Sequence, residues 1–419
     1  KADGLQKIYD LELALLPVLI KAEKIGVKVD VAYLQKLSKE YHKKLSSLEQ
    51  SIWKDAGQEF NIASPKQMGE ILFNKMGLSA KNQKKTSTGM KSTRESELEK
   101  MKDLHPIIPR ILEYRELAKL LSTYIDAIPT LLDSGDRLHT HLHQTGSTTG
   151  RMSSTDPNLQ NIPIRTELGR NIRHAFVAEK GFTLASLDYS QIELRIAAIL
   201  SEDPKFLEIF QTEQDVHMAV ASYVFKVKAA EVDKAMRTKA KTINFGVLYG
   251  MGVNALRQNL GGTREEAQIF YNEYFKRFSG LAQYLDKVKE EAMRKGYTET
   301  LFGRRRYFEG VTSKIPYIRA SAERMAINAP IQGTAADVMK LAMRAIGEWI
   351  LKEKLEEDVR MILQVHDELL FEIRTGKEKE IAESLRTLME SVLPAEKAHG
   401  VVCRANAAVG PSWGEMSEL

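Results

Sequence analysis

The sequence contains a single cysteine, Cys403, and no apolar stretch of membrane-spanning length. One cysteine excludes an intrachain disulfide framework and fits a reducing compartment, whether cytoplasmic, organellar or viral in origin. The apolar pattern from Ile8 to Ile20 is interrupted by Asp10 and Glu12, so we expect no membrane association. No secretory signal is evident, and Lys1 in place of methionine indicates a fragment or a processed chain.

The chain also lacks a strong charge of one sign and lacks the G-x-x-x-x-G-K-[ST] motif. Without that motif, a helicase or another P-loop motor is disfavoured. The formal net charge is only +5, which permits a polyanionic partner without requiring one. Basic clusters at Lys81–Lys85, Lys91 and Arg304–Arg306 fit either a nucleic-acid contact or a solvated surface. With 419 residues, the chain is long enough for two to four domains.

The segment RTKAKTINFGVLYG is the most informative part of the chain, because long side chains recur in it at every fourth position. On an α-helix this spacing places them on one face, with two cations at one end and two aromatic rings at the other. The cations suit a polyphosphate and the rings suit a base and a sugar. An amphipathic helix with snorkelling cations is the alternative for a lone helix. The four residues are Arg237, Lys241, Phe245 and Tyr249.

Two acidic motifs flank this helix in the sequence. Phe182 to Leu187 is short and apolar, which predicts a buried strand, and the helical spacing that follows predicts a helix capped by Ser190. Asp188 therefore lies at a strand-to-helix turn. In VRMILQVHDELLFEI, residues 359–365 and 369–373 predict two strands. The turn between them, His366 to Glu368, contains acids instead of the Gly or Asn that hairpins prefer, which suggests a functional turn, with a solvated acidic turn as the alternative.

Carboxylates on separate strand ends, together with a triphosphate-binding helix, suggest two-metal phosphoryl transfer. Mg²⁺ is the expected ion, because it prefers carboxylate oxygens and binds together with substrate phosphates. We expect two ions, for which Mn²⁺ can substitute.

The motifs DYSQIELR, RTKAKTINFGVLYG and QVHDE, in this order, resemble motifs A, B and C of family A DNA polymerases. Further similarity lies in TTGRMSSTDPNLQNIPIR and ERMAINAPIQGTAADVMK, and the resemblance covers nearly the whole chain, most strongly from about Thr148 onward. Several long motifs in order are far more specific than one short pattern.

The resemblance implies an α+β right-hand polymerase fold with an antiparallel palm sheet, helical fingers and a helical thumb. Its expected parts are the thumb at 1–138, the palm at 139–195 and 321–419, and the fingers at 196–320. The implied reaction is template-directed addition of deoxynucleotides to a primer 3′-hydroxyl by a monomer that binds primer–template DNA and deoxynucleoside triphosphates. At the thumb tip, Lys84, Lys85 and Lys91 would contact backbone phosphates.

The resemblance also implies roles for individual residues. Asp188, Asp367 and the Tyr189 carbonyl would bind the metals, with Glu368 and His366 in support. Lys241 would also protonate the leaving pyrophosphate, and Glu193 would exclude a ribose 2′-hydroxyl. The further nucleotide-binding residues would be Arg237, Phe245, Tyr249, His217 and Gln191, with Arg165 touching the triphosphate or its surroundings. Arg151 and Gln332, with Arg324 and Asn328 nearby, would contact the minor groove, where every base pair offers acceptors.

Other patterns favour structural interpretations. His139, His141 and His143 alternate as on one face of a strand, but a nearby Cys or carboxylate is missing, so an ordinary strand is favoured over a metal site. His217 is expected at an exposed position of an apolar helix. Asp10-Leu11-Glu12 has the form that opens a proofreading exonuclease, yet its helical context predicts a helix surface, and we expect no proofreading activity from this chain.

Two alternatives of other classes remain. A single-subunit RNA polymerase shares the architecture, although Glu193 and Phe245 match the DNA-synthesising pattern. A non-catalytic nucleic-acid-binding module would keep the basic surface, but it would not need both aspartates.

Overall fold

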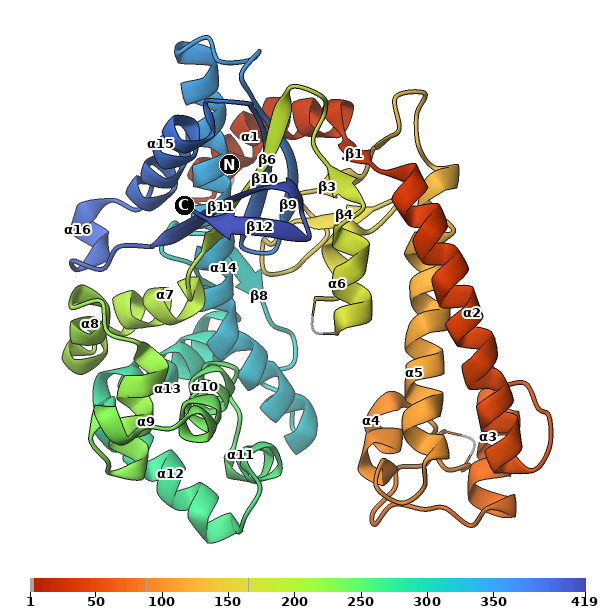
Figure 1. Ribbon diagram of the computed structural model, residues 1–419. Helices are drawn as coiled ribbons and strands as arrows, with labels where there is room; N and C mark the ends of the chain where they lie inside the picture. The colour runs from red at the N-terminus through yellow and green to blue at the C-terminus, as the bar shows by residue number, and fades with distance from the viewer. Residues whose placement is uncertain (1–3, 88, 165) are drawn as a thin grey trace.

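One antiparallel sheet, a cluster of helices and a two-helix arm make up this α+β molecule. The computed structural model describes residues 4–87, 89–164 and 166–419. In Figure 1 the sheet lies at the top, the helical cluster lies below it on the left, and the arm extends downward on the right. Within the described residues, no helix is both long and apolar enough to cross a membrane.

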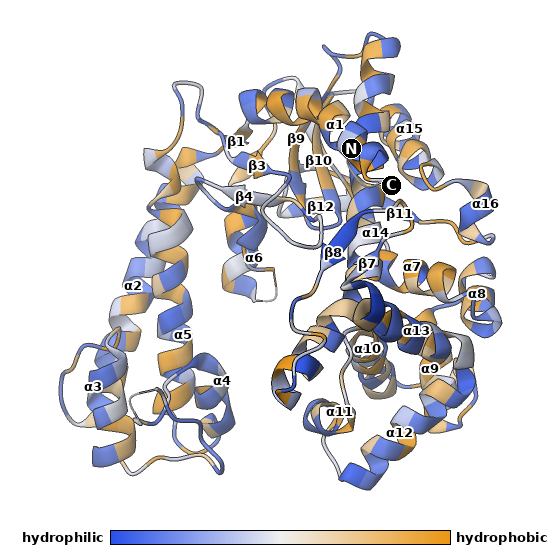
Figure 2. Ribbon diagram, turned by 180° about the vertical axis from the view of Figure 1, so that it is seen from behind, coloured by the Kyte–Doolittle hydropathy of each residue, from blue (hydrophilic) through white to orange (hydrophobic). Residues whose placement is uncertain are grey.

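The sheet collects strands from distant parts of the chain. Its order is β2-β1-β5-β11-β6-β10-β9, with β12 paired to β11, and every strand pair is antiparallel. The strands β9 and β10 are mostly hydrophobic (Figure 2), because both of their faces are covered. The bounds of the strands are β1 Val27–Val29, β2 Arg137–Leu138, β5 Phe176–Val177, β6 Phe182–Tyr189, β9 Val359–Val365, β10 Glu368–Arg374, β11 Ala405–Ser412 and β12 Glu415–Glu418. Two hairpins lie outside the sheet: β3 (His141–His143) with β4 (Ser153–Thr155), and β7 (Tyr297–Glu299) with β8 (Arg305–Tyr307).

Helices from both ends of the chain cover this sheet. The first helix, α1 (Gln6–Ile25), packs on β9 and on α14 (Pro316–Lys352), and α15 (Glu378–Ser391) packs on β6 and β11. The helix α1 therefore covers the sheet, and β1 is one of its strands. Neither belongs to the arm, although the expected thumb at 1–138 includes both. Two short helices, α6 (Glu167–Arg173) and α16 (Ala395–Ala398), flank the sheet.

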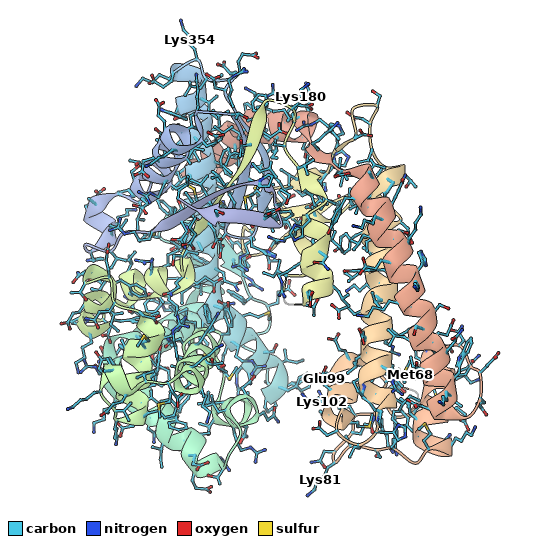
Figure 3. All side chains as sticks on the ribbon, in the orientation of Figure 1. Met68, Lys81, Glu99, Lys102, Lys180 and Lys354 are labelled. Atoms are coloured by element: carbon cyan, nitrogen blue, oxygen red, sulfur yellow. The ribbon has the colours of Figure 1, made fainter. Side chains whose placement is uncertain are left out.

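The arm consists of α2 (Val31–Ala56) and α5 (Ile107–Leu120), which pack against each other. Asp30 caps α2 by accepting from the Tyr33 N–H at 2.9 Å. At the tip, Ser64 caps α3 (Pro65–Gly69) with Pro65 at its start, as the sequence predicts. A separate apolar core around Met68 and Ile108 joins the tip elements, which include α4 (Glu95–Leu98). Lys81 projects from the far end of the arm, whereas Lys180 and Lys354 lie at the opposite end of the molecule (Figure 3).

The helical cluster follows the strand β6 and returns to the sheet through α14. One continuous apolar core runs from the cluster into the sheet. The helix α14 is 37 residues long and contains Pro330. The other helices are α7 (Ile192–Ser201), α8 (Pro204–Gln211), α9 (Val216–Phe225), α10 (Lys234–Leu248), α11 (Val253–Leu260), α12 (Arg264–Arg277) and α13 (Ser279–Lys295).

Candidate active site

Three acidic residues lie where β6 and β10 are side by side. Asp188 of β6 is directly opposite Glu368 of β10, and the Tyr189 N–H donates to the Asp367 carbonyl at 3.0 Å. His366 and Asp367 form a two-residue turn between β9 and β10, whereas the sequence predicted a turn that also contains Glu368, which is the first residue of β10. His366 adopts a left-handed conformation with φ 53°, which costs a non-glycine residue roughly 1–2 kcal/mol. The β9–β10 hairpin therefore holds His366 in a strained backbone conformation directly before Asp367.

The carboxylates differ in their partners. Glu368 accepts hydrogen bonds from the Ser186 hydroxyl at 2.5 Å and the Trp413 indole at 2.9 Å, and it lies 3.6 Å from the guanidinium of Arg173. Among the described residues, no side-chain hydrogen bond or ion pair engages the carboxylates of Asp188 or Asp367. Glu368 is therefore held by the protein, while both aspartates remain available to a ligand.

The electrostatics of the two aspartates favour a bound cation. The Asp188 side chain reaches solvent, yet surrounding protein atoms and the charges of Glu368 and Asp367 raise the pKa of its carboxyl to about 7. Burial also raises the pKa of Asp367, against the opposing charge of Arg151. Burial disfavours the ionised form of both carboxylates despite Arg151 and Arg173, so an additional cation bound there would stabilise them. In the part of the chain that the structure describes, no group of three His, Cys, Asp or Glu residues is arranged as a complete metal site.

Beside Asp367, an open pocket of about 340 Å³ gathers most of the predicted nucleotide-binding residues. The helix α10 contributes Arg237, Lys241 and Phe245, and Tyr249, the fourth residue of the stripe, follows the last helical residue. The stripe faces this pocket, as the spacing predicts. The lining residues are Arg151, Gln191, Ile192, Glu193, His217, Arg237, Lys241, Phe245, Tyr249 and Asp367.

At the cationic end of the pocket, Arg237 and His217 are held by neighbours that the sequence did not indicate. The Arg237 guanidinium donates twice to one oxygen of Asp215, at 2.9 and 2.7 Å. The other oxygen of Asp215 caps α9. His217 is 3% exposed, contrary to the exposed position expected, because α9 packs closely against α10.

The proton position on His217 follows from its contact with Asn244. The amide nitrogen of Asn244 lies 3.0 Å from the His217 Nδ1. With the amide nitrogen in this position, Nδ1 accepts and the ring proton lies on Nε2. Burial and the charges of Arg237 and Lys241 lower the pKa of His217 to about 4. His217 is therefore a neutral donor near pH 7.

The aromatic end of the pocket is joined to a buried carboxylate. The rings of Phe245 and Tyr249 are stacked with centroids 6.3 Å apart. The Tyr249 hydroxyl donates to Glu193 at 2.7 Å, and Arg151 donates to the other Glu193 oxygen at 2.5 Å. Glu193 is 5% exposed, and burial raises the pKa of its carboxyl against the opposing effect of Arg151.

Helix α7 starts differently from the prediction. The expected cap, Ser190, uses its backbone to accept from the Arg195 side chain, and its N–H donates to the Arg404 carbonyl. Gln191 takes the N-cap position in a left-handed conformation with φ 54°, without a side-chain cap. This turn brings Gln191 into the pocket lining and turns Glu193 inward.

The remaining predicted residues lie around this pocket or outside the described chain. Arg324, Asn328 and Gln332 follow one another along α14, and Gln332 lies close enough to Tyr249 to lower the pKa of its hydroxyl. Arg324 packs against Gly250, where a Cβ would lie 2.9 Å from its side chain. Arg165 lies outside the described residues.

Sequence reasoning missed the residues that support this site. Arg173 stacks 3.8 Å from the Trp413 ring and, with Ser186, surrounds Glu368. Asp215 and Asn244 hold the cationic end of the pocket in the same way. No short motif marks these residues. Asp215 did carry a signal, since it lies directly before an apolar helix in a capping position.

The alternating histidines do not converge on one point. Contrary to the expected absence of nearby carboxylates, the ring of His139 contacts Asp133 and the Glu23 carbonyl, and His141 lies 3.8 Å from the Glu23 carboxylate. His143 contacts Thr155 instead.

Comparisons with known proteins cover nearly the whole chain. The model of DNA polymerase family A matches residues 31–415. "DNA polymerase I, thermostable" of Thermus aquaticus is 46% identical over 406 residues, which cover 96% of this chain and 48% of that protein. "DNA polymerase I" of Pseudomonas aeruginosa is 45% identical over 410 residues, 97% of this chain and 44% of that protein. The chain thus spans about half the length of these curated relatives.

A solved structure agrees with this similarity. It is described as "POL domain of Pol1 from M. smegmatis complex with DNA primer-template and dNTP" and has 39% sequence identity and a TM-score of 0.90 to this chain. The match covers 96% of this chain and 70% of the other.

Proposed function

Because the chain belongs to DNA polymerase family A and has its right-hand polymerase fold, we propose that it adds deoxynucleotides to a primer 3′-hydroxyl under the direction of a template, releasing pyrophosphate. One observation carries this proposal: the pocket that holds the α10 stripe opens beside Asp367. A nucleoside triphosphate that binds with its phosphates at Arg237 and Lys241 and its base at Phe245 would place the reacting phosphate beside the carboxylates of the two aspartates.

Enzymes of this family depend on metal ions, and the residues present fit such a group. Asp188 and Asp367 would hold two Mg²⁺ ions together with the Tyr189 carbonyl, because both carboxylates lack protein partners and have raised pKa values. When bound, these ions would activate the primer hydroxyl and neutralise charge on the reacting phosphate. Glu368 and its neighbours would keep β10 in register with β6, and thereby keep the two aspartates adjacent.

The triphosphate would be bound by three side chains of different chemistry. Arg237 offers a planar fork for two phosphate oxygens, and it would exchange Asp215 for the ligand. His217 would donate from Nε2. Lys241 is exposed, faces the pocket one turn after Arg237, and would supply the proton that the leaving pyrophosphate takes up.

Sugar selection would depend on the buried group of Glu193, Tyr249 and Arg151. The carboxylate is fixed from both sides, so its stem occupies a defined volume beside the pocket. A 2′-hydroxyl placed there would meet a side chain that cannot move aside. Gln191 would line the same wall.

Primer–template DNA would contact the arm, the sheet and the helical cluster. Arg151, Gln332, Arg324 and Asn328 would reach the minor groove, and His366 would touch the primer terminus. We assign the arm at residues 31–125 to the thumb and the helical cluster to the fingers. We assign the sheet with α1 and the C-terminal part of α14 to the palm.

Primer extension with matched deoxynucleotides and ribonucleotides tests the proposal. We expect metal-dependent, template-directed extension with deoxynucleotides and far less with ribonucleotides. Efficient use of ribonucleotides would favour the RNA polymerase, and DNA binding without extension in any metal would favour a non-catalytic module.

A further inference from the structure

Glu12 of helix α1 is not the surface residue that the sequence predicts. It is 22% exposed, and one of its oxygens accepts from both Lys340, at 2.6 Å, and Arg304, at 2.5 Å. Its other oxygen and its carbonyl accept from the amide of Gln144. The sequence could not show this, since Arg304 and Lys340 lie 292 and 328 residues away.

Glu12 belongs to a closed network of two acids and two bases. Arg304 also donates to Asp337 at 2.7 Å, and the second Asp337 oxygen accepts from Thr300 at 2.6 Å. Asp337 and Lys340 are 0% and 1% exposed. Buried charges of this kind are tolerated when they are paired and hydrogen-bonded. The network joins α1, the β7–β8 hairpin and α14.

This network supports the backbone directly before Arg151. Gly150 has φ 84°, and a Cβ there would lie 2.6 Å from the Cδ and Nε of Arg304. Gly150 therefore packs directly against the side chain of Arg304. The next residue, Arg151, extends to Glu193 and lines both the nucleotide pocket and the small space beside His366 and Asp367.

We propose that Glu12 is a positioning residue of the polymerase site, which acts through Arg304 and Gly150 on Arg151. With its two contacts, Glu12 fixes the direction of the Arg304 side chain and neutralises Lys340 beneath the site. The inference rests on the proposed function, because it concerns the catalytic efficiency of that reaction. Asp10, two residues earlier, is exposed and contacts only Gln6 among the described residues, so it provides a matched control.

The test compares Glu12→Gln in two backgrounds, using kcat/KM for single-nucleotide incorporation. In the wild-type background, we expect Glu12→Gln to lower kcat/KM about three- to tenfold, while Asp10→Asn leaves it unchanged. In an Arg151→Ala background, where the end of the chain of contacts is already missing, Glu12→Gln should have no further effect. An equal loss in both backgrounds, or no loss in either, would overturn the proposal.

Stability is controlled separately, because Glu12→Gln leaves Lys340 buried without a partner. The double variant Glu12→Gln/Lys340→Met removes that unpaired charge and should recover the Tm while kcat/KM stays reduced. If the single variant does not fold, the same comparison is made with the double variant and with Lys340→Met alone. Recovery of kcat/KM to the Lys340→Met value would refute the role of Glu12. Absence of extension by the wild-type chain would count against the proposed function instead.

Discussion

At the scale of single residues, the burial of Glu193 has the most direct consequence. A carboxylate at 5% exposure between an arginine and a tyrosine hydroxyl is costly to maintain, since burial opposes its charge. A surface Glu that only pairs with a nearby cation would need neither the burial nor the contact with the tyrosine hydroxyl. The arrangement therefore favours a role that depends on a fixed position.

We expect Glu193→Ala to admit ribonucleotides more readily while deoxynucleotide use falls less. A single steric contact discriminates by about 10- to 200-fold, so the ratio of kcat/KM for deoxynucleotides and ribonucleotides should fall by about this factor. Glu193→Gln keeps the volume and removes the charge, and it should retain most of the selectivity. An unchanged ratio in the alanine variant would show that Glu193 is not the sugar gate.

The unpartnered aspartates give a second expectation. Asp188→Asn or Asp367→Asn should abolish extension while primer–template binding remains nearly intact, because the duplex would be held by other side chains. Loss of an anionic ligand at the reacting centre typically costs several kcal/mol of transition-state stabilisation. Single-turnover rates and DNA-binding constants separate the two effects. Asp286→Asn, an exposed control, should change neither.

The buried His217 predicts a pH dependence of folding. Its pKa is about 4 in the folded chain against 6.5 in the unfolded chain, so the unfolded state binds the additional proton as the pH falls. The contribution of His217 to the free energy of unfolding is present above pH 6.5 and is lost as the pH falls, by about 2 kcal/mol at pH 5. Denaturant unfolding at pH 8 and pH 5 should show a smaller loss for His217→Gln than for wild type. Equal losses would mean that His217 is not buried as a neutral ring.

The sequence predicts residues of this site when their spacing is local, and it misses them when the contact is distant. Asp188, Asp367 and the α10 stripe are visible because a strand end or a helical repeat sets their direction. The burial of His217 depends on how α9 packs against α10, which no local pattern contains. Glu12 shows the same limit more strongly, because a D-x-E on a helix appears solvated until its partners are known.

At the scale of elements, the predicted strands and the α10 helix are confirmed with small differences at their ends. Periodicity predicts such elements well, because α10 and the β9–β10 hairpin each present one face to a defined neighbour. The start of α7 differs because tertiary contacts hold Ser190 and place Gln191 in a left-handed turn. The sheet order could not be predicted, since its neighbours β6 and β11 are more than 200 residues apart.

The arm gives a prediction at this scale. Lys84 and Lys85 are exposed near the tip, and phosphate contacts made there would be independent of sequence. The double variant Lys84→Gln/Lys85→Gln should weaken primer–template binding similarly for all sequences. It should also reduce the slope of log K against log salt by about 2. Lys180→Gln/Lys354→Gln, at the other end of the molecule, is the matched control and should leave the slope unchanged. An unaltered slope in the tip variant would exclude these lysines from the DNA contact.

At the scale of the whole molecule, the 419-residue chain should not remove a mismatched primer 3′ end. In the structure Asp10 and Glu12 lie on a helix, and Glu12 is occupied by Arg304 and Lys340. An end-labelled mismatched primer, incubated with metal and without nucleotides, should keep its length. Metal-dependent shortening that disappears in Asp10→Asn/Glu12→Gln would contradict this expectation.

The position of β11 in the sheet has a consequence for biosynthesis. This strand lies between β5 and β6, although it is formed by residues 405–412, close to the last residue described. A ribosome must therefore release the residues up to 412 before the middle of the sheet can close, whereas the arm at residues 31–125 can form much earlier. Until then, β6 has one exposed edge, because only its other neighbour, β10 at residues 368–374, can already be paired with it. We expect nascent chains to require protection by chaperones at this stage, and premature termination before residue 405 to yield aggregation-prone products.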